Sequence, residues 1–585
     1  MADSTTAERI PEGVGAERWV GRAVPRVEDP RLLTGAGRYT DDTSDPASLE
    51  VHMVRSTEAH ARILSIDISA ASEVEGVEAV LTGQDLVDRG VKEIEIFSVG
   101  PDQKQRTYPV LAVDRVRFVG DPVVAILAES RYVAEDAAAL VEVEYDPLPV
   151  LTDAAAALEP DAPLLYEEWG DNVIDSLVFE GGDADAVIDG ADVVISERLR
   201  SHRYTSMPME TRASHAEIDR AGDLVVTISH QAPHRAKTQI SEMFDLPAQR
   251  LRVLTHDVGG GFGLKEHVQP EDALVVMFAM ETGRPVRYVE DRNEHFFASS
   301  HAREQLHELE LAAAQDGTIV ALRDRVLADF GGRLERTGSA PMARTLVALA
   351  GPYRIPDLRG EALAVATNKV PSGGYRGFGT PQGVFVLERA VDRLARELDM
   401  DPAELRRKNF IRPDEFPYTT AVHATYDSGD YSATLDQALE LADYEGWRER
   451  QAALRDEGRC IGIGISTYVE PTGVAPSPFF KEVGTRIGGY EAVTVEIDAQ
   501  GRATVHTGMV ATGQGHQTTL AQIAADALGV PMPDVQVIQG DTHVTPYAPA
   551  GAIGSRGATV GGAAVLRASE RLRRKVQAQA AHMLE

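Results

Sequence analysis

The chain has 585 residues and a mass of 63.2 kDa, with 43% hydrophobic and 25% charged residues, a composition that is ordinary for a globular protein. Its 58 basic and 91 acidic residues give a formal net charge of −33, and a surface this acidic repels nucleic-acid phosphates and anionic lipids. The single cysteine, Cys460, excludes an internal disulfide framework, a cysteine-ligated zinc site and an iron–sulfur cluster held by this chain alone.

Two further features of the sequence bear on its location. The longest clear apolar run, residues 273–280, has eight residues, whereas a membrane-spanning helix needs about 20. The first 15 residues are polar and acidic and lack the charged-then-apolar pattern of a signal peptide. We therefore predict a cytoplasmic protein with no membrane span and no nucleic-acid partner.

Short strand and helix patterns alternate from residue 30 to residue 150 and predict a compact α/β domain that follows an N-terminal arm, residues 1–29. The predicted strands are residues 49–53, 79–81, 122–128 and 141–145, and the predicted helix is 131–140. An Ala- and Pro-rich stretch comes next, so residues 151–184 are interpreted as a linker that runs over the surface.

Two regions of mixed helix and strand patterns follow, residues 185–410 and 411–585. In the first, the predicted strands are 191–199, 224–230 and 251–254, and the predicted helices are 238–244, 270–281 and 384–398. In the second, the predicted strands are 461–468, 492–497 and 504–508, and the predicted helices are 432–456, 518–528 and 563–585. The last helix pattern lacks a closing Gly, Asn or Pro, so we expect the chain to stop inside an element.

Four glycine-rich loops lie in these two regions: Asp257–Glu266, Gly373–Gln382, Thr512–Thr519 and Gly551–Gly562. Backbone N–H groups of successive glycines can converge on an anion or on a cofactor oxygen. The first loop has Leu264 where a dinucleotide fingerprint needs glycine, and it lacks the Gly-Lys-Ser/Thr of a P-loop. Each loop alone has a simpler interpretation as a tight turn, but the set, with its embedded Gln, Arg, Phe and Ser, favours one large elongated ligand such as a phosphate-bearing pterin.

Short motifs follow one another in a characteristic order along nearly the whole chain. They are Gly21–Asp42, Arg55–Asp67, Tyr145–Pro149, Pro208–Glu210, Gln231–His234, Gly259–Glu266, Arg376–Gln382, Gly513–Thr519 and Gly554–Arg556. Together they resemble the molybdopterin-binding large subunit of the xanthine dehydrogenase, aldehyde oxidase and carbon monoxide dehydrogenase family, and most of all its bacterial carbon monoxide dehydrogenase-type branch. The resemblance implies an α+β fold, with an N-terminal α/β hammerhead-like domain at 30–150. Large mixed α/β molybdenum-cofactor-binding domains follow at 185–410 and 411–585, the last one truncated.

The resemblance also implies a chemistry. The family hydroxylates an electron-poor carbon, in an aldehyde or an N-heterocycle, with water as the oxygen source. Its molybdenum is held by the pterin dithiolene rather than by protein side chains, and the implied cofactor is molybdenum-molybdopterin in its cytosine dinucleotide form. Electrons are implied to leave through a medium subunit that binds FAD and a small subunit that binds [2Fe-2S] clusters.

Site roles implied by the resemblance concentrate on the glycine-rich loops. Gln231 is implied to hydrogen-bond the apical oxo group, Glu266 to orient the substrate and Arg344 to polarise it. Arg376 and Phe378 are implied to lie beside the metal and to form an aromatic wall for the substrate. The residues implied to contact the cofactor are Gly260, Gly261, Phe262, Gly263, Arg376, Gly377, Gly513, Gln514, Gly515, His516, Thr518, Gly554, Ser555 and Arg556. For Arg344 an ordinary structural arginine stays an open alternative, because its match rests on ungapped spacing to Arg376.

The sequence departs from the family pattern at two places. Carbon monoxide oxidisers carry a copper-binding cysteine in the loop after Tyr-Arg, where this sequence has Gly377; Cys460 lies elsewhere and is interpreted as a buried structural thiol. The family's general base is a glutamate in a Gly-x-Gly-Glu motif, and the sequence contains no such motif. Because loss of a general base typically costs roughly 10²–10⁴-fold in rate, we expect this chain alone to turn over little and to bind cofactor poorly.

Several functional hypotheses follow from these observations. The leading one is a molybdenum hydroxylase large subunit, either incomplete or completed by a companion chain that supplies the glutamate. A carbon monoxide dehydrogenase-type large subunit is disfavoured by Gly377, and a generic dinucleotide dehydrogenase is disfavoured by the glycine spacing. A non-catalytic remnant that binds cofactor or partners is the remaining alternative.

Overall fold

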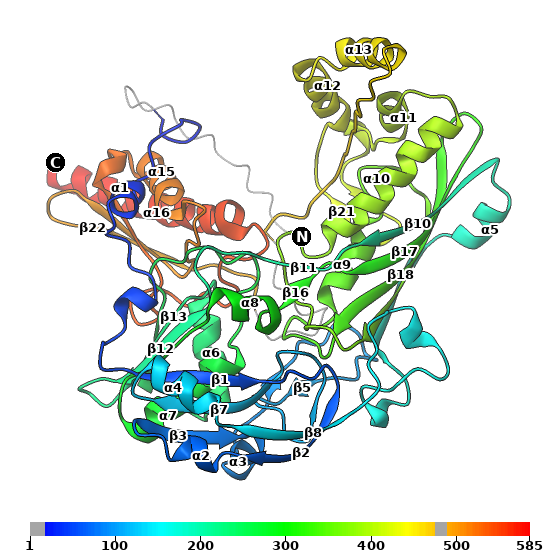
Figure 1. The fold of residues 1–585 in the computed structure, drawn as a ribbon. Coiled ribbons are helices and arrows are strands. Elements are labelled where there is room, and N and C mark those ends of the chain that lie inside the picture. Colours follow the sequence, from blue (N-terminus) through cyan, green and yellow to red (C-terminus); the bar gives the residue numbers. More distant parts are fainter. Residues whose placement is uncertain (1–17, 474–487, 585) are drawn as a thin grey trace.

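The computed structural model describes residues 18–473 and 488–584. Its central feature is a seven-stranded sheet in the order β14-β13-β12-β15-β1-β7-β3, to which two distant parts of the chain contribute (Figure 1). The strands are β1 (Leu49–Arg55), β3 (Val77–Thr82), β7 (Pro122–Ala128), β12 (Ala213–Ile218), β13 (Leu224–Ile228), β14 (Leu251–Leu254) and β15 (Val286–Val289). The junction is a parallel pairing of β1 with β15, in which Leu49 lies opposite Val286. The hammerhead-like region and the region after it therefore share one sheet.

The burial of this sheet explains why its strands could be predicted from the sequence. All seven residues of β7 are buried, as expected for a central strand with both faces covered. Helix α7 (Pro270–Thr282) packs against β12 and β15 and buries ten of its residues in succession, from Pro270 to Ala279. A helix that is hydrophobic all round belongs inside a large core rather than on its surface.

The remaining elements of the hammerhead-like region form a smaller layer beside this sheet. A three-stranded sheet has the order β6-β2-β8. Its elements and their neighbours are β2 (Ala61–Asp67), β4 (Ile94–Glu95), β5 (Thr107–Tyr108), β6 (Arg115–Val116), β8 (Glu142–Pro147), α2 (Ser69–Ser72), α3 (Gly83–Asp88) and α4 (Arg131–Ala138). The predicted helix 131–140 and strand 141–145 are thus confirmed within two residues of their bounds.

A second large sheet has five strands in the order β10-β17-β18-β19-β9. They are β9 (Val173–Gly181), β10 (Val193–Ser201), β17 (Gln305–Ala313), β18 (Ile319–Gly331) and β19 (Asp357–Ala366). Helices α9 (Ala340–Ala348) and α10 (Thr380–Glu397) pack against it. Strand β9 lies inside the segment 151–184 that was interpreted as linker; this interpretation is wrong for residues 173–181, whose alternating burial completes the edge of the sheet.

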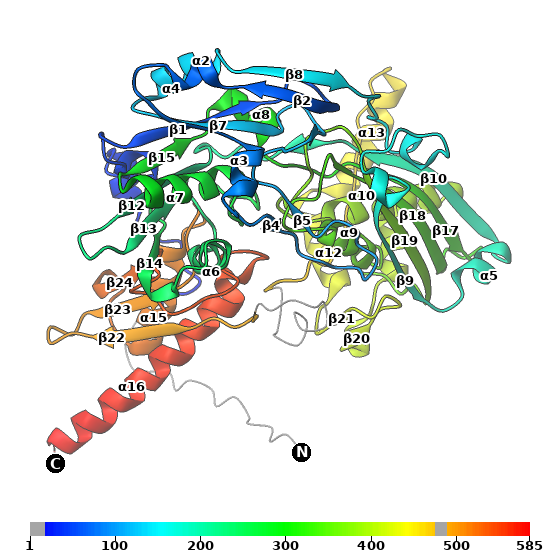
Figure 2. The ribbon, with the colours of Figure 1, turned by 90° about the horizontal axis from the view of Figure 1, so that it is seen from below.

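The C-terminal region contains a three-stranded sheet covered by two helices. The strands are β22 (Val493–Ile497), β23 (Ala503–Thr507) and β24 (Val535–Ile538), and the helices are α15 (His516–Leu528) and α16 (Ala563–Leu584). Figure 2 shows α16 crossing the β22 strand. Two N-terminal side chains, Trp19 and Val24, pack against the core of this region.

Three expectations about residues 432–468 are corrected. The predicted helix 432–456 is two helices, α12 (Tyr431–Leu441) and α13 (Tyr444–Asp456), and the predicted strand 461–468 has no strand partner. In place of a β-ladder, its backbone is held by side chains: Arg406 donates to the carbonyl oxygen of Ile465, and Thr467 N donates to the carboxylate of Glu388. Cys460, interpreted above as a buried thiol, is exposed because it follows the end of α13.

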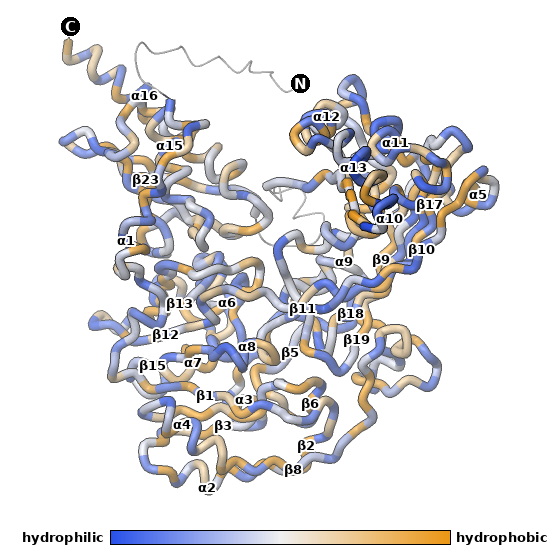
Figure 3. The backbone as a smooth tube through the Cα atoms, turned by 45° about the horizontal axis from the view of Figure 1, so that its top comes forward, coloured by the Kyte–Doolittle hydropathy of each residue, from blue (hydrophilic) through white to orange (hydrophobic). Residues whose placement is uncertain are grey.

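The other elements connect these layers. They are α1 (Asp29–Leu33), α5 (Ala184–Asp189), α6 (Pro233–Met243), α8 (Arg292–Ala298), α11 (Pro402–Asn409), β11 (Tyr204–Thr205), β16 (His301–Ala302), β20 (Tyr418–Thr419) and β21 (Thr425–Tyr426). Among the described residues no helix is both long and apolar enough to cross a membrane. Even the long α16 mixes hydrophobic and hydrophilic residues along its length (Figure 3).

Candidate functional site

The first and second glycine-rich loops pack directly against each other. Loop 257–266 connects β14 to α7, and loop 373–382 connects β19 to α10. The backbone N–H of Arg376 donates to the carbonyl oxygen of Phe262 at 2.8 Å. A Cβ on Gly263 would lie only 2.7 Å from the carbonyl oxygen of Gly374, so the two backbones can approach this closely only because position 263 has no side chain.

The two phenylalanines of these loops adopt the left-handed conformation, with φ of 57° for Phe262 and 50° for Phe378. Bulky residues rarely adopt this region, which costs about 1–3 kcal/mol and is concentrated at functional sites. The ring of Phe262 remains 39% exposed. The strained turns therefore present a flat apolar face at the junction of the two loops.

Gln231 connects the first loop to the fourth. Its Oε1 accepts a hydrogen bond from Gly263 N at 2.8 Å, and its Nε2 donates to the carbonyl oxygen of Ala552 at 3.4 Å. Its backbone carbonyl also accepts from Ala552 N at 3.0 Å. A Cβ on Gly261 would lie 2.5 Å from Oε1 of Gln231. The amide of Gln231 is therefore fixed in one orientation between segments that are more than 300 residues apart in sequence.

A buried ion pair that the sequence analysis missed anchors the same loop. Lys265 is 2% exposed, and its Nζ donates to Glu210 Oε2 at 2.9 Å and to the Glu210 carbonyl oxygen at 2.8 Å. The Glu210 carboxylate also accepts from Gly259 N at 2.9 Å and from Ser229 Oγ at 2.6 Å. Burial lowers the pKa of Lys265, and the charge of Glu210 opposes this shift. The only sequence signal was that each residue lies in one of the family motifs, Pro208–Glu210 and Gly259–Glu266, and these motifs assigned neither residue a role.

The third and fourth loops meet at the N-terminus of α15. Gly515 is its N-cap residue, and the ring of His516 lies against Gly557, where a Cβ would be 2.3 Å from His516 Nε2. Gln514 folds back so that its Oε1 accepts from Thr512 N. Ser555 has a positive φ of 55°. The predicted residues of both loops are thus brought together.

Arg556 and Thr518 are engaged inside the protein. Arg556 is 1% exposed, and its Nη2 donates to the carbonyl oxygens of Gly489 and Tyr490 at 3.1 and 3.2 Å. Burial lowers its pKa, which nearby Glu491 opposes. Thr518 Oγ1 donates to Glu28 Oε2 at 2.5 Å. Both residues thus support the backbone around the third and fourth loops.

Among the described residues, no hydrogen bond or ion pair joins Glu266 to Arg344. Glu266 lies against helix α6, with Oε2 3.7 Å from Arg235 Nη1 and 3.8 Å from His267 Nε2. Burial raises the pKa of Glu266, and Arg235 opposes this shift. Arg344 lies on α9, and within the described part of the chain it makes no hydrogen bond or ion pair; burial lowers its pKa, with Glu470 opposing.

Backbone donors of the loops that make no hydrogen bond within the described residues fit an anionic, phosphate-bearing cofactor. Within residues 18–473 and 488–584, no hydrogen bond occupies the backbone N–H groups of Gly260, Gly261 and Phe262, nor those of Gly513, Gln514 and Gly515. Consecutive free N–H groups in such turns form an anion-binding concavity, and the second set lies at a helix N-terminus, where the dipole also favours negative charge. The described residues contain no group of three or more His, Cys, Asp or Glu side chains that could hold a metal ion.

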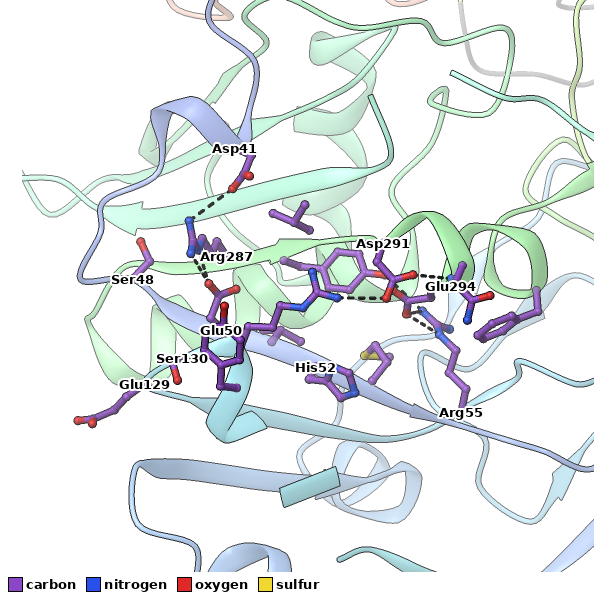
Figure 4. Close-up of a pocket in the computed structure, with 18 of the residues that line it drawn as sticks. Asp41, Ser48, Glu50, His52, Arg55, Glu129, Ser130, Arg287, Asp291 and Glu294 are labelled. Atoms are coloured by element: carbon purple, nitrogen blue, oxygen red, sulfur yellow. Dashed lines mark hydrogen bonds and ion pairs between the residues drawn. The ribbon is translucent and has the colours of Figure 1, made fainter. Parts of the chain in front are cut away.

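A polar cavity of about 770 Å³ lies apart from all four loops, between β1, α4 and α8 (Figure 4). Its arginines are already paired: Arg55 with Glu294 at 2.7 Å and Arg131 with Asp291 at 3.1 Å, while Arg287 pairs with Glu50. None of its lining residues belongs to the glycine-rich loops, so this cavity is not the predicted site.

Comparison with known proteins supplies an independent view of the chain. Residues 34–149 match the aldehyde oxidase and xanthine dehydrogenase a/b hammerhead domain, and residues 165–410 and 437–585 each match a molybdopterin cofactor-binding domain. The chain is 38% identical over 578 residues to the carbon monoxide dehydrogenase large chain of Hydrogenophaga pseudoflava, covering 95% of this chain and 71% of that one. It is also 38% identical over 570 residues to the nicotine 6-hydroxylase large subunit of Paenarthrobacter nicotinovorans, covering 97% of this chain and 69% of that one.

Solved structures give the same result. Quinoline 2-oxidoreductase from Pseudomonas putida 86 superposes with a TM-score of 0.90 at 37% identity, covering 96% of this chain and 71% of that one. Reconstituted CO dehydrogenase from Oligotropha carboxidovorans superposes with a TM-score of 0.89 at 36% identity, covering 96% and 72%.

Proposed function

This chain belongs to the family of molybdopterin-binding large subunits of xanthine dehydrogenase, aldehyde oxidase and carbon monoxide dehydrogenase, and we propose that its substrate is an aldehyde or an N-heterocycle. Its mixed α/β architecture, with a hammerhead domain and cofactor-binding domains, is that of a molybdenum hydroxylase, so it is an oxidoreductase. The observation that supports the site assignment is the bridge that Gln231 makes between Gly263 and Ala552. This bridge joins the first glycine-rich loop to the fourth, which supports a cofactor site shared by the two loops.

We propose that the chain's own residues position the cofactor and exclude other ligands, and that they do not coordinate the metal themselves. When bound, molybdenum-molybdopterin supplies the redox chemistry. The N–H groups of residues 260–262 and 513–515 would bind its anionic groups, and the proposed form of the cofactor is the cytosine dinucleotide. Gln231, held at both ends of its amide, would offer a fixed hydrogen-bonding group to the bound cofactor, and Arg376 would contact the cofactor from the second loop.

The substrate is proposed to lie between aromatic faces. Phe262 and Phe378 belong to the two loops that pack against each other, and the partly exposed ring of Phe262 can stack on a flat heterocycle. Glu266 remains the proposed substrate-orienting carboxyl, and because burial raises its pKa, a protonated Oε2 is available to donate a hydrogen bond at a higher pH than for an exposed glutamate. Arg344, with its guanidinium unpaired in the described part of the chain, is the proposed polarising residue.

Carbon monoxide oxidation is a second candidate because carbon monoxide dehydrogenase large chains are among the relatives. Gly377 argues against it. This position has φ of 96°, and a Cβ would lie 2.5 Å from Pro381 Cγ, so this loop conformation has no room for the side chain of a copper-binding cysteine. Copper in a purified active complex would contradict this argument.

We propose that the chain works as one subunit of a cytoplasmic complex. The relatives are named large chains or large subunits, which supports a medium FAD-binding partner and a small [2Fe-2S] partner. A companion sequence that carries the Gly-x-Gly-Glu base, absent from these 585 residues, stays a prediction.

The test is to purify the native complex and to measure molybdenum, cytidine nucleotide and turnover with a panel of aldehydes and N-heterocycles. Gln231→Ala and Arg376→Ala should lower turnover, whereas Arg220→Ala, an exposed residue far from the loops, should not. Unchanged turnover in both site variants would contradict the site assignment, and a complex without molybdenum would contradict the cofactor.

A further inference from the structure

Residues 18–43 contact both the first and the third glycine-rich loop; they comprise the described part of the N-terminal arm and the segment that follows it, and together they are called the arm from here on. We propose that Glu28 and Arg31 are positioning residues that set the distance between these two loops. The inference rests on the proposed function, because it assigns the arm a role in holding the two halves of the cofactor site. In Figure 1 the blue helix α1 lies beside the orange helix α15.

At the third loop the arm binds the first turn of α15. Thr518 Oγ1 donates to Glu28 Oε2 at 2.5 Å and accepts from Val27 N at 2.9 Å. Glu28 is only 4% exposed. Further along the same helix, the backbone N–H groups of Trp19 and Val20 donate to the Asp526 carboxylate at 2.7 and 3.0 Å. The arm therefore follows α15 from its N-terminal turn onward.

At the first loop the arm binds the residue that precedes the glycines. Both terminal nitrogens of Arg31 donate to the carboxylate of Asp257, with Nη2 2.6 Å from Oδ1. The backbone of Arg38 donates to Asp257 Oδ2 at 2.9 Å and accepts from Asp257 N at 2.9 Å. A bidentate arginine–carboxylate pair fixes orientation as well as distance. Gly259 follows only two residues after Asp257.

One turn of helix separates the two contacts. Glu28 precedes α1 (Asp29–Leu33) and Arg31 lies within it, so their backbones are about 4.5 Å apart along the helix axis. Within the described residues, no hydrogen bond or ion pair joins loop 257–266 directly to loop 512–519. Their regions also meet elsewhere, where Thr255 N donates to the carbonyl oxygen of Gly540 at 2.7 Å. That contact lies beside the loops, whereas the arm connects the start of one loop to the end of the other.

This arrangement explains why the family-like motif begins so far upstream of the cofactor loops. A ligand can bind the free N–H groups of residues 260–262 and those of residues 513–515 at the same time only if the two sets are held at a fixed distance from each other. A short helix held by a buried carboxylate at one end and a bidentate guanidinium at the other provides that separation before the ligand binds, which lowers the entropic cost of binding.

The experiment compares Glu28→Gln and Arg31→Gln with the wild-type complex by hydrogen exchange and by molybdenum release. Each variant is expected to increase exchange in both loops, 257–266 and 512–519, although each removes a contact to only one of them. Molybdenum should leave about tenfold faster on dilution, the size expected for the loss of one charge-assisted hydrogen bond. Arg31→Lys keeps the positive charge but cannot form the bidentate pair with Asp257, so it should restore molybdenum retention in part.

Matched controls are Glu73→Gln and Arg220→Gln, which are exposed and lie outside these contacts. The proposal is overturned if exchange rises only within residues 18–43, or only in the loop that the altered residue touches, while molybdenum retention stays at the wild-type rate. If the wild-type complex holds no molybdenum, the proposed function fails, and the exchange data still decide whether the arm couples the two loops.

Discussion

Replacing Lys265 with methionine tests whether a buried ion pair holds the first glycine-rich loop. The ammonium group is fully inaccessible, with side-chain exposures of 0% for Lys265 and 14% for Glu210. Methionine retains most of the volume of the stem and removes the charge and both hydrogen bonds. The variant therefore leaves the Glu210 carboxylate in place without its cation.

The structure sets the size of the effect. Removing one partner of a buried ion pair costs about 3–5 kcal/mol, because the remaining charge stays buried. Glu210 keeps three other donors, Gly259 N, Ser229 Oγ and Thr40 N, so we expect the lower end, about 3 kcal/mol. That corresponds to roughly 100-fold easier opening of the loop, at 1.4 kcal/mol per factor of ten.

Hydrogen exchange followed by mass spectrometry of peptides across residues 257–266 measures this opening. Lys265→Met should lose about two orders of magnitude of protection there, because the amide of Gly259 donates to the carboxylate that is left uncompensated. Lys92→Met is the matched control: its partner Asp245 is 80% exposed, and exposed pairs contribute only about 0–1 kcal/mol. Equal protection in wild type and Lys265→Met would refute the argument that this pair anchors the loop.

Two further predictions concern a close approach and a buried carboxyl. Gly263→Ala should abolish molybdenum retention, because its φ of 104° is strained for alanine and its Cβ would lie 2.7 Å from the Gly374 carbonyl oxygen. Gly90→Ala is the control: its φ of 70° gives the same kind of backbone strain, but its Cβ would have no neighbour within 4 Å. The Gly90→Ala variant should therefore retain molybdenum. Burial raises the pKa of Glu491 from 4.5 to about 7, with Arg556 opposing, so the folded chain favours the protonated form and stability falls as pH rises from about 4.5 through 7. The shift is equivalent to about 3 kcal/mol, so Glu491→Gln should raise the midpoint of denaturant unfolding at pH 8 and have little effect at pH 5; equal effects at both pH values would contradict the shift.

Local patterns predicted the elements whose causes are local. Strand β7 has the predicted bounds because seven consecutive apolar residues with β-branched side chains indicate a buried strand. Helix α6 begins five residues before its predicted start, because Pro233 occupies the first turn, where its missing N–H costs nothing. Segment 461–468 was predicted as a strand because its apolar residues alternate. In the structure it has no neighbouring strand, and the side chains of Arg406 and Glu388 hydrogen-bond to its backbone instead.

The candidate site shows the same division between local motif and distant partner. The sequence pattern located the glycine-rich loops and Gln231, because each is a compact motif. It assigned no role to Glu210 or Lys265, since their pairing spans 55 residues and depends on where β12 and β14 lie in one sheet. Glu266 was placed by its motif, yet its orientation toward Arg235 depends on helix α6 packing beside the loop.

The two cofactor-binding regions are joined by contacts between residues that lie far apart in the sequence. Local sequence patterns do not predict such contacts, so the sequence analysis assigned the arm no function. A parallel pair such as β1 with β15 needs a long crossover, here more than 230 residues, and no periodicity in either strand identifies its partner. The Arg31–Asp257 pair spans 226 residues and the Glu28–Thr518 pair 490, while Glu28 and Arg31 themselves are three residues apart. In the sequence this segment has only the features of a polar arm. In the folded chain it joins the first and third glycine-rich loops, because Glu28 and Arg31, one helical turn apart, each bind a residue of a different domain.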